Sequence, residues 1–200
     1  MADLALPKTF TSPTHGQLLW EEVLNKVVWF MSLDTGASYD VIIGTDSEAR
    51  LASDGESKRA RLARDESGRG VNGQSDFVSA IVVHKKGRGG VYFWGRQKIK
   101  NLYSMKQRIW QEATISLALA QRVVDDFAKM GMFDPSMDSG QVASNGFGTG
   151  LNLEIHVDIG PNGPTRELIA DIVGMIRANG FKVAIKPSSW GASHVADRHV

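Results

Sequence analysis

The stretch Val41-Ile42-Ile43-Gly44-Thr45-Asp46 places an acidic residue directly after a run of apolar residues. A short run that is apolar on both faces is typical of a strand near the middle of a sheet. Three later acids, Glu112, Asp158 and Asp197, stand where they can converge on Asp46. Carboxylates that meet at strand ends suit Mg²⁺ or Mn²⁺, which prefer hard oxygen ligands. The sequence therefore predicts a metal site built around Asp46.

The chain around this stretch alternates between strands and helices. Helices are indicated by apolar residues at helical spacing, and strands by short apolar runs between turn residues. We expect helices at 17–33, 104–130 and 164–179 and from 189 to the end, and strands at 41–45, 77–84, 91–97, 153–157 and 182–186. This order predicts an α/β fold with a five-stranded mixed sheet. Three antiparallel strands come first and two parallel strands follow, with helices on both faces.

Length and composition predict one globular domain, residues 1–200, because 42% of the 200 residues are hydrophobic. We expect residues 1–38 to supply a covering helix and residues 50–75, which are polar and charged, to form a mobile insertion loop. The absence of Cys excludes disulfides and thiol nucleophiles. No secretory signal and no apolar run of about 20 residues is present, which predicts a cytoplasmic protein without a membrane partner. The oligomeric state is not predicted.

Basic residues are concentrated in one part of the chain. Residues 77–111 contain no acid, although the net charge of the whole chain is only +1. Aromatic residues are interleaved there, and cations with aromatic rings are typical of a nucleic-acid surface. Aromatic residues in a strand are also typical of a core, and lysines in a hairpin loop are often simply solvated. The candidate nucleic-acid-binding residues are Lys85, Lys86, Arg88, Arg96, Lys98, Lys100, Lys106 and Arg108.

The four acids suit the hydrolysis of phosphodiester bonds. That reaction needs an activated water and stabilisation of the leaving oxygen, and two divalent ions about 4 Å apart supply both. Asp46, at the exit of a central strand, is the natural bridging ligand. Glu112 lies about two turns into the long helix, and Asp158 follows another strand. Taken singly, each acid also has a structural explanation, because an Asp at a strand end is commonly a turn or cap residue.

Several other residues are weaker candidates. Ser47, Glu48 and His194 are possible auxiliary residues of the site because they lie next to the acids in the sequence. The pattern favours a buried, hydrogen-bonded structural role for His156 over a metal-binding one. The turn at 160–163 is suited to cradle a phosphate on free backbone N–H groups, and a plain turn explains it equally well.

Four longer motifs are specific: IGTDS at 43–47, RIWQEATISLALA at 108–120, EIHVDIGPNGPT at 154–165 and KPSSWGASHVADRH at 186–199. They resemble the YkuK-type ribonuclease H-like proteins, and the similarity extends over nearly the whole chain. The resemblance implies a ribonuclease H-like fold and a nuclease whose catalytic metal ligands are Asp46, Glu112, Asp158 and Asp197. The insertion at 50–75 is longer than this pattern leads us to expect. Glu48 resembles the first motif of proofreading exonucleases, but the spacing from His194 to Asp197 does not match that group.

Three hypotheses follow for the function. The leading one is a metal-dependent nuclease that acts on RNA, an RNA–DNA hybrid or structured DNA by a two-metal mechanism. The alternative is a non-catalytic nucleic-acid-binding module with the same fold. Nucleotide hydrolysis in the manner of actin and sugar kinases is a third, because residues 44–47 and 158–165 loosely resemble two phosphate loops. Those folds need two such domains, whereas this chain has the length of one.

Overall fold

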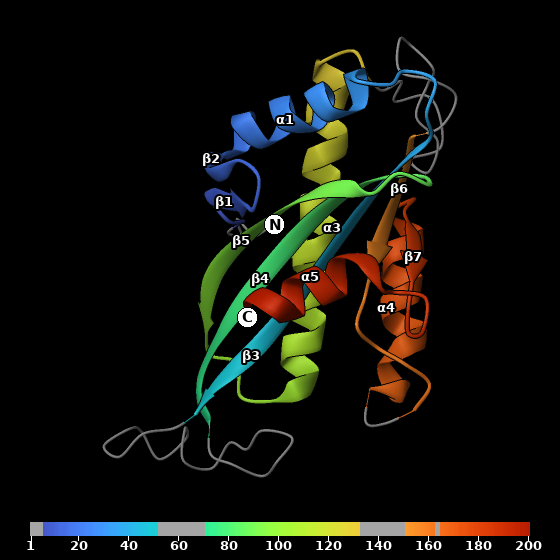
Figure 1. Cartoon of the computed structure of the whole chain (residues 1–200). Helices are drawn as coiled ribbons and strands as arrows, with labels where there is room; N and C mark the ends of the chain where they lie inside the picture. The colour runs from blue at the N-terminus through green and yellow to red at the C-terminus, as the bar shows by residue number, and fades with distance from the viewer. Residues whose placement is uncertain (1–5, 52–70, 133–150, 163–164) are drawn as a thin grey trace.

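The computed structural model describes residues 6–51, 71–132, 151–162 and 165–200. The strands in these ranges are β1 (Thr9–Ser12), β2 (Gly16–Leu19), β3 (Tyr39–Leu51), β4 (Val71–Lys85), β5 (Gly90–Lys100), β6 (Leu151–His156) and β7 (Lys182–Ala184). The helices are α1 (Trp20–Ser32), α3 (Met105–Lys129), α4 (Ile169–Ala178) and α5 (Gly191–His199), and a 3-10 turn (Arg166–Leu168) precedes α4. All the strands join one mixed sheet in the order β2-β1-β5-β4-β3-β6-β7 (Figure 1).

The α/β class and the mixed sheet are confirmed, but the sheet has seven strands rather than the predicted five. The two additional strands, β1 and β2, form a hairpin, and β1 also pairs with β5. The helix predicted at 17–33 therefore begins only at Trp20. Leu18 is 7% exposed and Leu19 is 60% exposed, which is the alternation of a strand. Gly16, with a φ of 72°, makes the turn that starts β2.

The predicted insertion at 50–75 is shorter in the structure because paired strands occupy both of its ends. β3 continues to Leu51 and β4 begins at Val71, and these two residues pair with each other. The rest of the insertion, residues 52–70, lies outside the described residues, and so does its predicted mobility.

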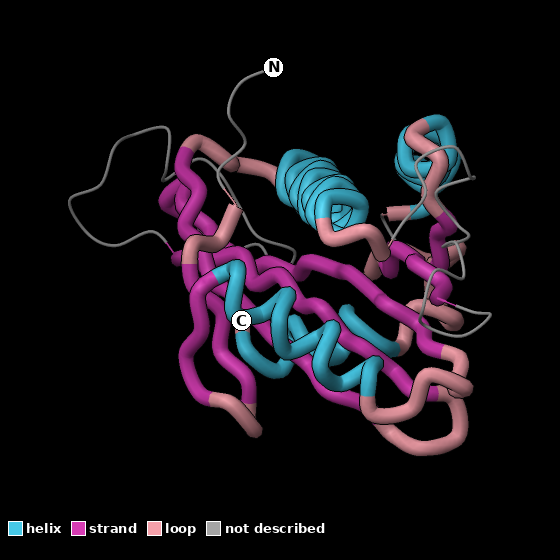
Figure 2. The backbone as a smooth tube through the Cα atoms, turned by 90° about the horizontal axis from the view of Figure 1, so that it is seen from above, coloured by secondary structure: helices cyan, strands magenta, loops and turns pink. Residues whose placement is uncertain are grey.

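β3 lies between an antiparallel neighbour, β4, and a parallel neighbour, β6. Its side chains alternate between two cores. Val41 and Ile43 pack in the larger core with residues of α1, α3 and α4, whereas Ile42 packs with Ala192 and Ala196 of α5. Figure 2 shows α5 on the opposite side of the sheet from the other helices. Helices therefore cover both faces, as predicted.

The start of α3 is fixed by a reciprocal cap. The Ser104 hydroxyl accepts a hydrogen bond from the backbone N–H of Gln107 at 3.2 Å, and the Gln107 side-chain oxygen accepts one from the N–H of Ser104 at 3.1 Å. This cap sets which residues of α3 face the sheet and places Glu112 two turns into the helix. Neither α3 nor any other helix in the described ranges is long and apolar enough to cross a bilayer.

Candidate active site

A cavity lies along β3 at the point where β6 leaves it. The pairing of β3 with β6 ends at Gly44 and His156, while β3 continues, paired only with β4. The free edge of β3 borders a cavity of about 250 Å³. Asp46 and Asp158 each come two residues after the last pair, and adjacent strands are about 4.8 Å apart. The register of two parallel strands therefore brings these two acids to the same cavity.

Three of the four predicted acids, Asp46, Glu112 and Asp158, line this cavity. Asp197 is exposed on α5 and is not among the lining residues. Its negative charge nevertheless raises the pKa of Asp46, so it acts on the same site. Gly44 allows this approach of α5, because a Cβ atom at Gly44 would lie 2.9 Å from the Cβ of Ala192.

Hydrogen bonds between hydroxyl groups join α3 to β3 next to Glu112. The Ser47 hydroxyl donates to Oε1 of Glu112 at 2.6 Å, and the Ser116 hydroxyl donates to the Thr45 hydroxyl at 3.0 Å. The hydroxyls of Thr45 and Ser79 lie 3.0 Å apart and are also hydrogen-bonded. These contacts fix how far α3 is shifted along β3. Ser47, predicted as an auxiliary residue, thus contacts one of the acids directly.

Burial is the largest cause of a raised pKa at both Asp46 and Glu112. The pKa of Asp46 is raised to about 6 by burial, with further increases from the charges of Asp158 and Asp197. The pKa of Glu112 is raised to about 8 by burial and then by the charge of Asp46, while Arg108 acts in the opposite direction. At pH 7 most Glu112 side chains are therefore protonated and most Asp46 side chains are ionised. A bound cation would favour full ionisation of this cluster at pH 7.

Two basic side chains line the same cavity. Arg108 is only 9% exposed, and its Nη1 donates to the carbonyl oxygen of Ser47 at 3.2 Å. Lys186 lies on the other side, with its Nζ 2.9 Å from Oδ1 of Asp158. Arg108 was predicted from the sequence to belong to a nucleic-acid surface, and Lys186 was not predicted to be part of the site. The only sequence signal for Lys186 was its position at the start of the motif at 186–199.

The donor set suits a hard divalent cation, although no metal site is formed by the side chains as they stand. Among the described residues, no three His, Asp or Glu side chains are grouped closely enough to hold an ion. Protein groups engage two of the acids: the Ser47 hydroxyl contacts Glu112, and the Lys186 ammonium contacts Asp158. Carboxylates around one cavity, two of them with raised pKa values, are still the ligand type that Mg²⁺ and Mn²⁺ prefer. The ligand set of Asp46, Glu112, Asp158 and Asp197 stays a prediction.

The other candidate residues have different surroundings. Glu48 is exposed and does not line the cavity, and His194 is exposed on α5 beside a separate hollow next to Tyr92. His156 is 2% exposed, and its Nδ1 accepts a hydrogen bond from the backbone N–H of Gly191 at 3.2 Å. The structural role predicted for His156 is therefore confirmed: it holds the first residue of α5 on the sheet.

The basic residues predicted to bind nucleic acid divide between two ends of the β4–β5 hairpin. Lys85 and Lys86 are engaged by acids, with Nζ atoms 2.6 Å from Asp34 and 3.4 Å from Asp40. Lys85 pairs with Tyr39, which is seven residues from Asp46 along β3, or about 23 Å at the usual rise of a strand. Arg88 is exposed in the turn beside these lysines, and Lys106 is exposed at the start of α3.

Three of the basic residues lie on the same face of the sheet as Asp46. Arg96 pairs with Val78, and Val78 pairs with Asp46, so the three side chains form a row across β5, β4 and β3. Lys98 and Lys100 follow Arg96 at alternate positions on β5, and all three are exposed. We call these three residues the basic row. Arg96 also donates a hydrogen bond to the backbone carbonyl of His199, at the end of α5.

Comparison with known proteins agrees with the motifs. The sequence model of a family described as Ribonuclease H-like matches residues 67–200, a region that contains Glu112, Asp158 and Asp197 and begins after Asp46. The uncharacterized protein YkuK of Bacillus subtilis is 28% identical over 202 residues, which cover 99% of this chain and 98% of YkuK. No solved structure matches the chain. The resemblance to YkuK-type ribonuclease H-like proteins is thus confirmed.

Proposed function

The chain belongs to the ribonuclease H-like family, and on this premise we propose that it is a metal-dependent nuclease. It would hydrolyse phosphodiester bonds of RNA, an RNA–DNA hybrid or structured DNA. The observation that carries the proposal is the cavity lined by Asp46, Glu112 and Asp158. Carboxylates from within β3, from the segment after β6 and from α3 converge there, and hard cations that assist phosphoryl transfer take such ligands.

In this proposal, Asp46, Glu112, Asp158 and Asp197 hold Mg²⁺ or Mn²⁺. A pair of such ions supplies an activated water and stabilises charge on the leaving oxygen. Asp46 would be the central ligand of the set, because the charges of both Asp158 and Asp197 raise its pKa. Glu112 must release its proton to become a ligand, since its pKa is raised to about 8 in the metal-free protein. The Ser47 hydroxyl then orients the ionised carboxylate.

The substrate backbone would lie along the basic row, Arg96, Lys98 and Lys100. These three residues are exposed and share the face of Asp46, whereas Lys85 and Lys86 are paired with acids at the far end of the hairpin. Exposed cations at alternate positions of a strand track a phosphate backbone without reading its sequence. The nucleic-acid surface proposed here is therefore smaller than the basic stretch as a whole.

A second candidate function is a nucleic-acid-binding module without catalysis. One observation favours it: the Ser47 and Lys186 side chains already engage two of the acids, and no metal-binding group of three is formed within the described ranges. In that case the basic row would supply affinity, and the acids would have no catalytic role.

The decisive experiment compares Asp46→Asn with Asp40→Asn, an acid on the same strand outside the cavity. Mg²⁺ and then Mn²⁺ are titrated into each protein, and cleavage of labelled RNA, RNA–DNA hybrid and structured DNA is followed. We expect the wild type and Asp40→Asn to cleave one of these substrates, and Asp46→Asn to fall to background. Cleavage by Asp46→Asn at the wild-type rate would refute the proposal. Metal-independent binding without cleavage of any substrate would favour the second function.

A further inference from the structure

Lys186 lines the cavity, and the reaction proposed above does not use it. Its Nζ lies 2.9 Å from Oδ1 of Asp158, while 57% of its side chain is exposed. The hydrogen bond to Asp158 is the main cause that raises the pKa of Lys186, and the charges of Asp46 and Asp197 raise it further. This one ammonium group therefore interacts electrostatically with three of the four acids.

The backbone holds Lys186 next to Asp158 on both sides. The N–H of Val157 donates to the carbonyl oxygen of Ala184 at 3.0 Å, and the N–H of Lys186 donates to that of Ile159 at 2.9 Å. The parallel pairing of β6 with β7 thus continues past the ends of both strands. The Lys186 stem also packs over Gly160, where an added Cβ would lie 3.2 Å from the Cβ of Lys186. The fold therefore fixes the base of the side chain, while the flexible stem leaves the ammonium group free to move.

Stability does not account for this arrangement. An exposed pair of Lys and Asp contributes only about 0–1 kcal/mol to stability, because water solvates both charges well. A divalent cation is a stronger partner for the Asp158 carboxylate than an ammonium group is. Once such a cation binds, the Lys186 ammonium would lose its partner but stay within reach of the cavity, because the base of its side chain is held next to Gly160. A nucleic-acid substrate bound at this cavity would bring a phosphate group close to Lys186. Lysine binds phosphate as a point charge.

We propose that Lys186 binds the substrate: Asp158 holds its ammonium group in the free protein and releases it to a phosphate oxygen when a divalent cation binds to Asp158. The inference rests on the proposed function for the identity of the cation and of the substrate. Lys186 would thus contact the substrate phosphate directly, and it would do so only while the cation is bound.

The test is the salt dependence of binding, measured with and without a divalent cation. Fluorescence anisotropy is recorded over a series of KCl concentrations for three nucleic acids: a labelled RNA, the same RNA annealed to DNA, and a labelled structured DNA. One series contains Ca²⁺, with the substrate checked to be intact afterwards, and the other contains EDTA. The proteins are the wild type, Lys186→Met, Lys186→Arg and Lys182→Met. Lys182 is the matched control, an exposed lysine of β7 that contacts Asn152 instead of the cavity.

Log affinity falls as log salt concentration rises. In Ca²⁺, Lys186→Met should make this negative slope shallower by about 0.7–0.9, the value for one phosphate contact. In EDTA its slope should equal that of the wild type, because Asp158 then retains the ammonium group. Lys186→Arg should restore the slope in Ca²⁺, and Lys182→Met should match the wild type in both series. A structural defect in Lys186→Met would affect binding in Ca²⁺ and in EDTA alike, so it would not produce a change of slope that is confined to Ca²⁺.

Two results would overturn the inference. An unchanged slope in Ca²⁺ would show that Lys186 makes no phosphate contact, and an equal decrease in both series would show that Asp158 does not control it. A wild type that binds none of the three nucleic acids would refute both this inference and the proposed function. If the wild type cleaves nothing but the slope changes only in Ca²⁺, the inference holds and the nuclease activity does not.

Discussion

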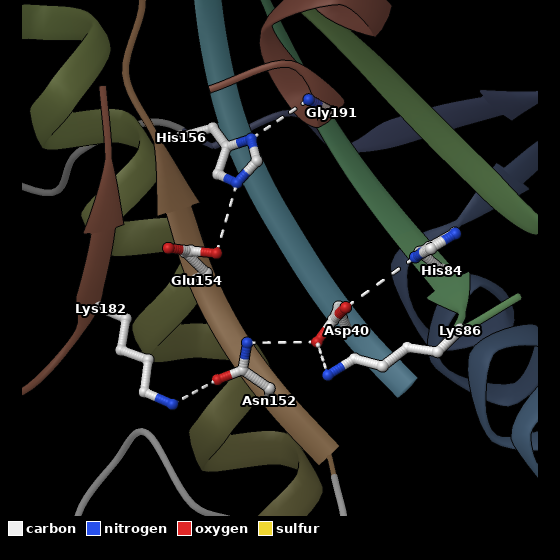
Figure 3. Close-up of polar contacts among 8 residues, drawn as sticks. All are labelled: Asp40, His84, Lys86, Asn152, Glu154, His156, Lys182 and Gly191. Atoms are coloured by element: carbon white, nitrogen blue, oxygen red, sulfur yellow. Dashed lines mark hydrogen bonds and ion pairs between the residues drawn. The ribbon is translucent and has the colours of Figure 1, made fainter. Parts of the chain in front are cut away.

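The two ends of the β3–β6 strand pair carry similar side chains in different surroundings. At the end where the strands are paired, Asn152 donates to Asp40 at 3.2 Å, and Lys182 donates to Asn152 at 2.6 Å (Figure 3). Lys86 reaches Asp40 at 3.4 Å. At the open end, two residues beyond the last pair, Asp46 lies in a cavity with Asp158. Asp40, at the paired end, has close partners from β6 and from the end of β4, whereas Asp46, Asp158 and Glu112 line one cavity at the open end.

This difference comes from the backbone rather than from the type of side chain. Where β3 and β6 are paired, their side chains are one strand spacing apart and can form hydrogen bonds or ion pairs with one another. Where β6 leaves, the edge of β3 opens, and α3 and α5 bring further acids to the gap from the two faces. Burial and like charges then raise the pKa of Asp46. An acid next to the end of strand pairing is therefore a better candidate for chemistry than an acid within the paired region.

The largest expected effect is on the pH dependence of stability in EDTA. The pKa of Glu112 is about 8 in the folded protein, above the usual 4.5, so its contribution to stability is complete below pH 4.5 and is lost as the pH rises towards 8. Glu112→Gln keeps the neutral form at every pH. It should match the wild type at pH 5 and exceed it at pH 9 by on the order of a few kcal/mol in the free energy of unfolding, measured with urea.

Glu154→Gln is the control for this prediction, because Glu154 pairs with Ile42 within the paired region and does not line the cavity. Its profile should run parallel to that of the wild type. If Glu112→Gln also ran parallel to the wild type from pH 5 to pH 9, burial would not be holding Glu112 in its protonated form.

A smaller effect, of opposite sign at the two ends, is expected for Asp→Asn substitutions at pH 8 in EDTA. Asp46 has a pKa raised to about 6, so its ionised form destabilises the folded protein. Asp46→Asn should therefore raise the free energy of unfolding by roughly 3 kcal/mol, because a pKa raised from 3.8 to about 6 costs about 1.4 kcal/mol per unit at pH 8. Asp40→Asn should lower it by about 0.5 kcal/mol, because it weakens the contact with Lys86. Two changes of the same sign in chemical denaturation would contradict the contrast between the two ends.

The smallest effect concerns the basic residues at the two ends of the hairpin. Lys98 belongs to the basic row on the face of Asp46, whereas Lys86 is paired with Asp40. Lys98→Met should make the negative slope of log affinity against log salt concentration shallower by about 0.7–0.9, and Lys86→Met should leave that slope unchanged. A salt dependence that weakens equally in both variants would mean that the nucleic-acid surface extends over the whole hairpin, and one unchanged in both would remove Lys98 from it.

Much of the fold could be predicted because its signals are local. The apolar run before Asp46 indicated β3, and helical spacing indicated α3 with Glu112 two turns inside it. The β1–β2 hairpin was missed because its strands have four residues each, and they are held by pairing with β5, far along the chain. Lys186 was missed for a similar reason. Its contact with Asp158 depends on the pairing of two segments that lie almost thirty residues apart.

The sequence by itself determined the alternation of strands and helices, the four acids and the resemblance to the ribonuclease H-like family, because periodicity and motifs are written in neighbouring residues. Only the tertiary structure decided which charges meet. It divided the basic residues of 77–111 between two ends of a hairpin, and it placed Arg108 and Lys186 in the cavity with the acids. The physical reason is that charges interact over distances in space, and strand register and helix packing set those distances.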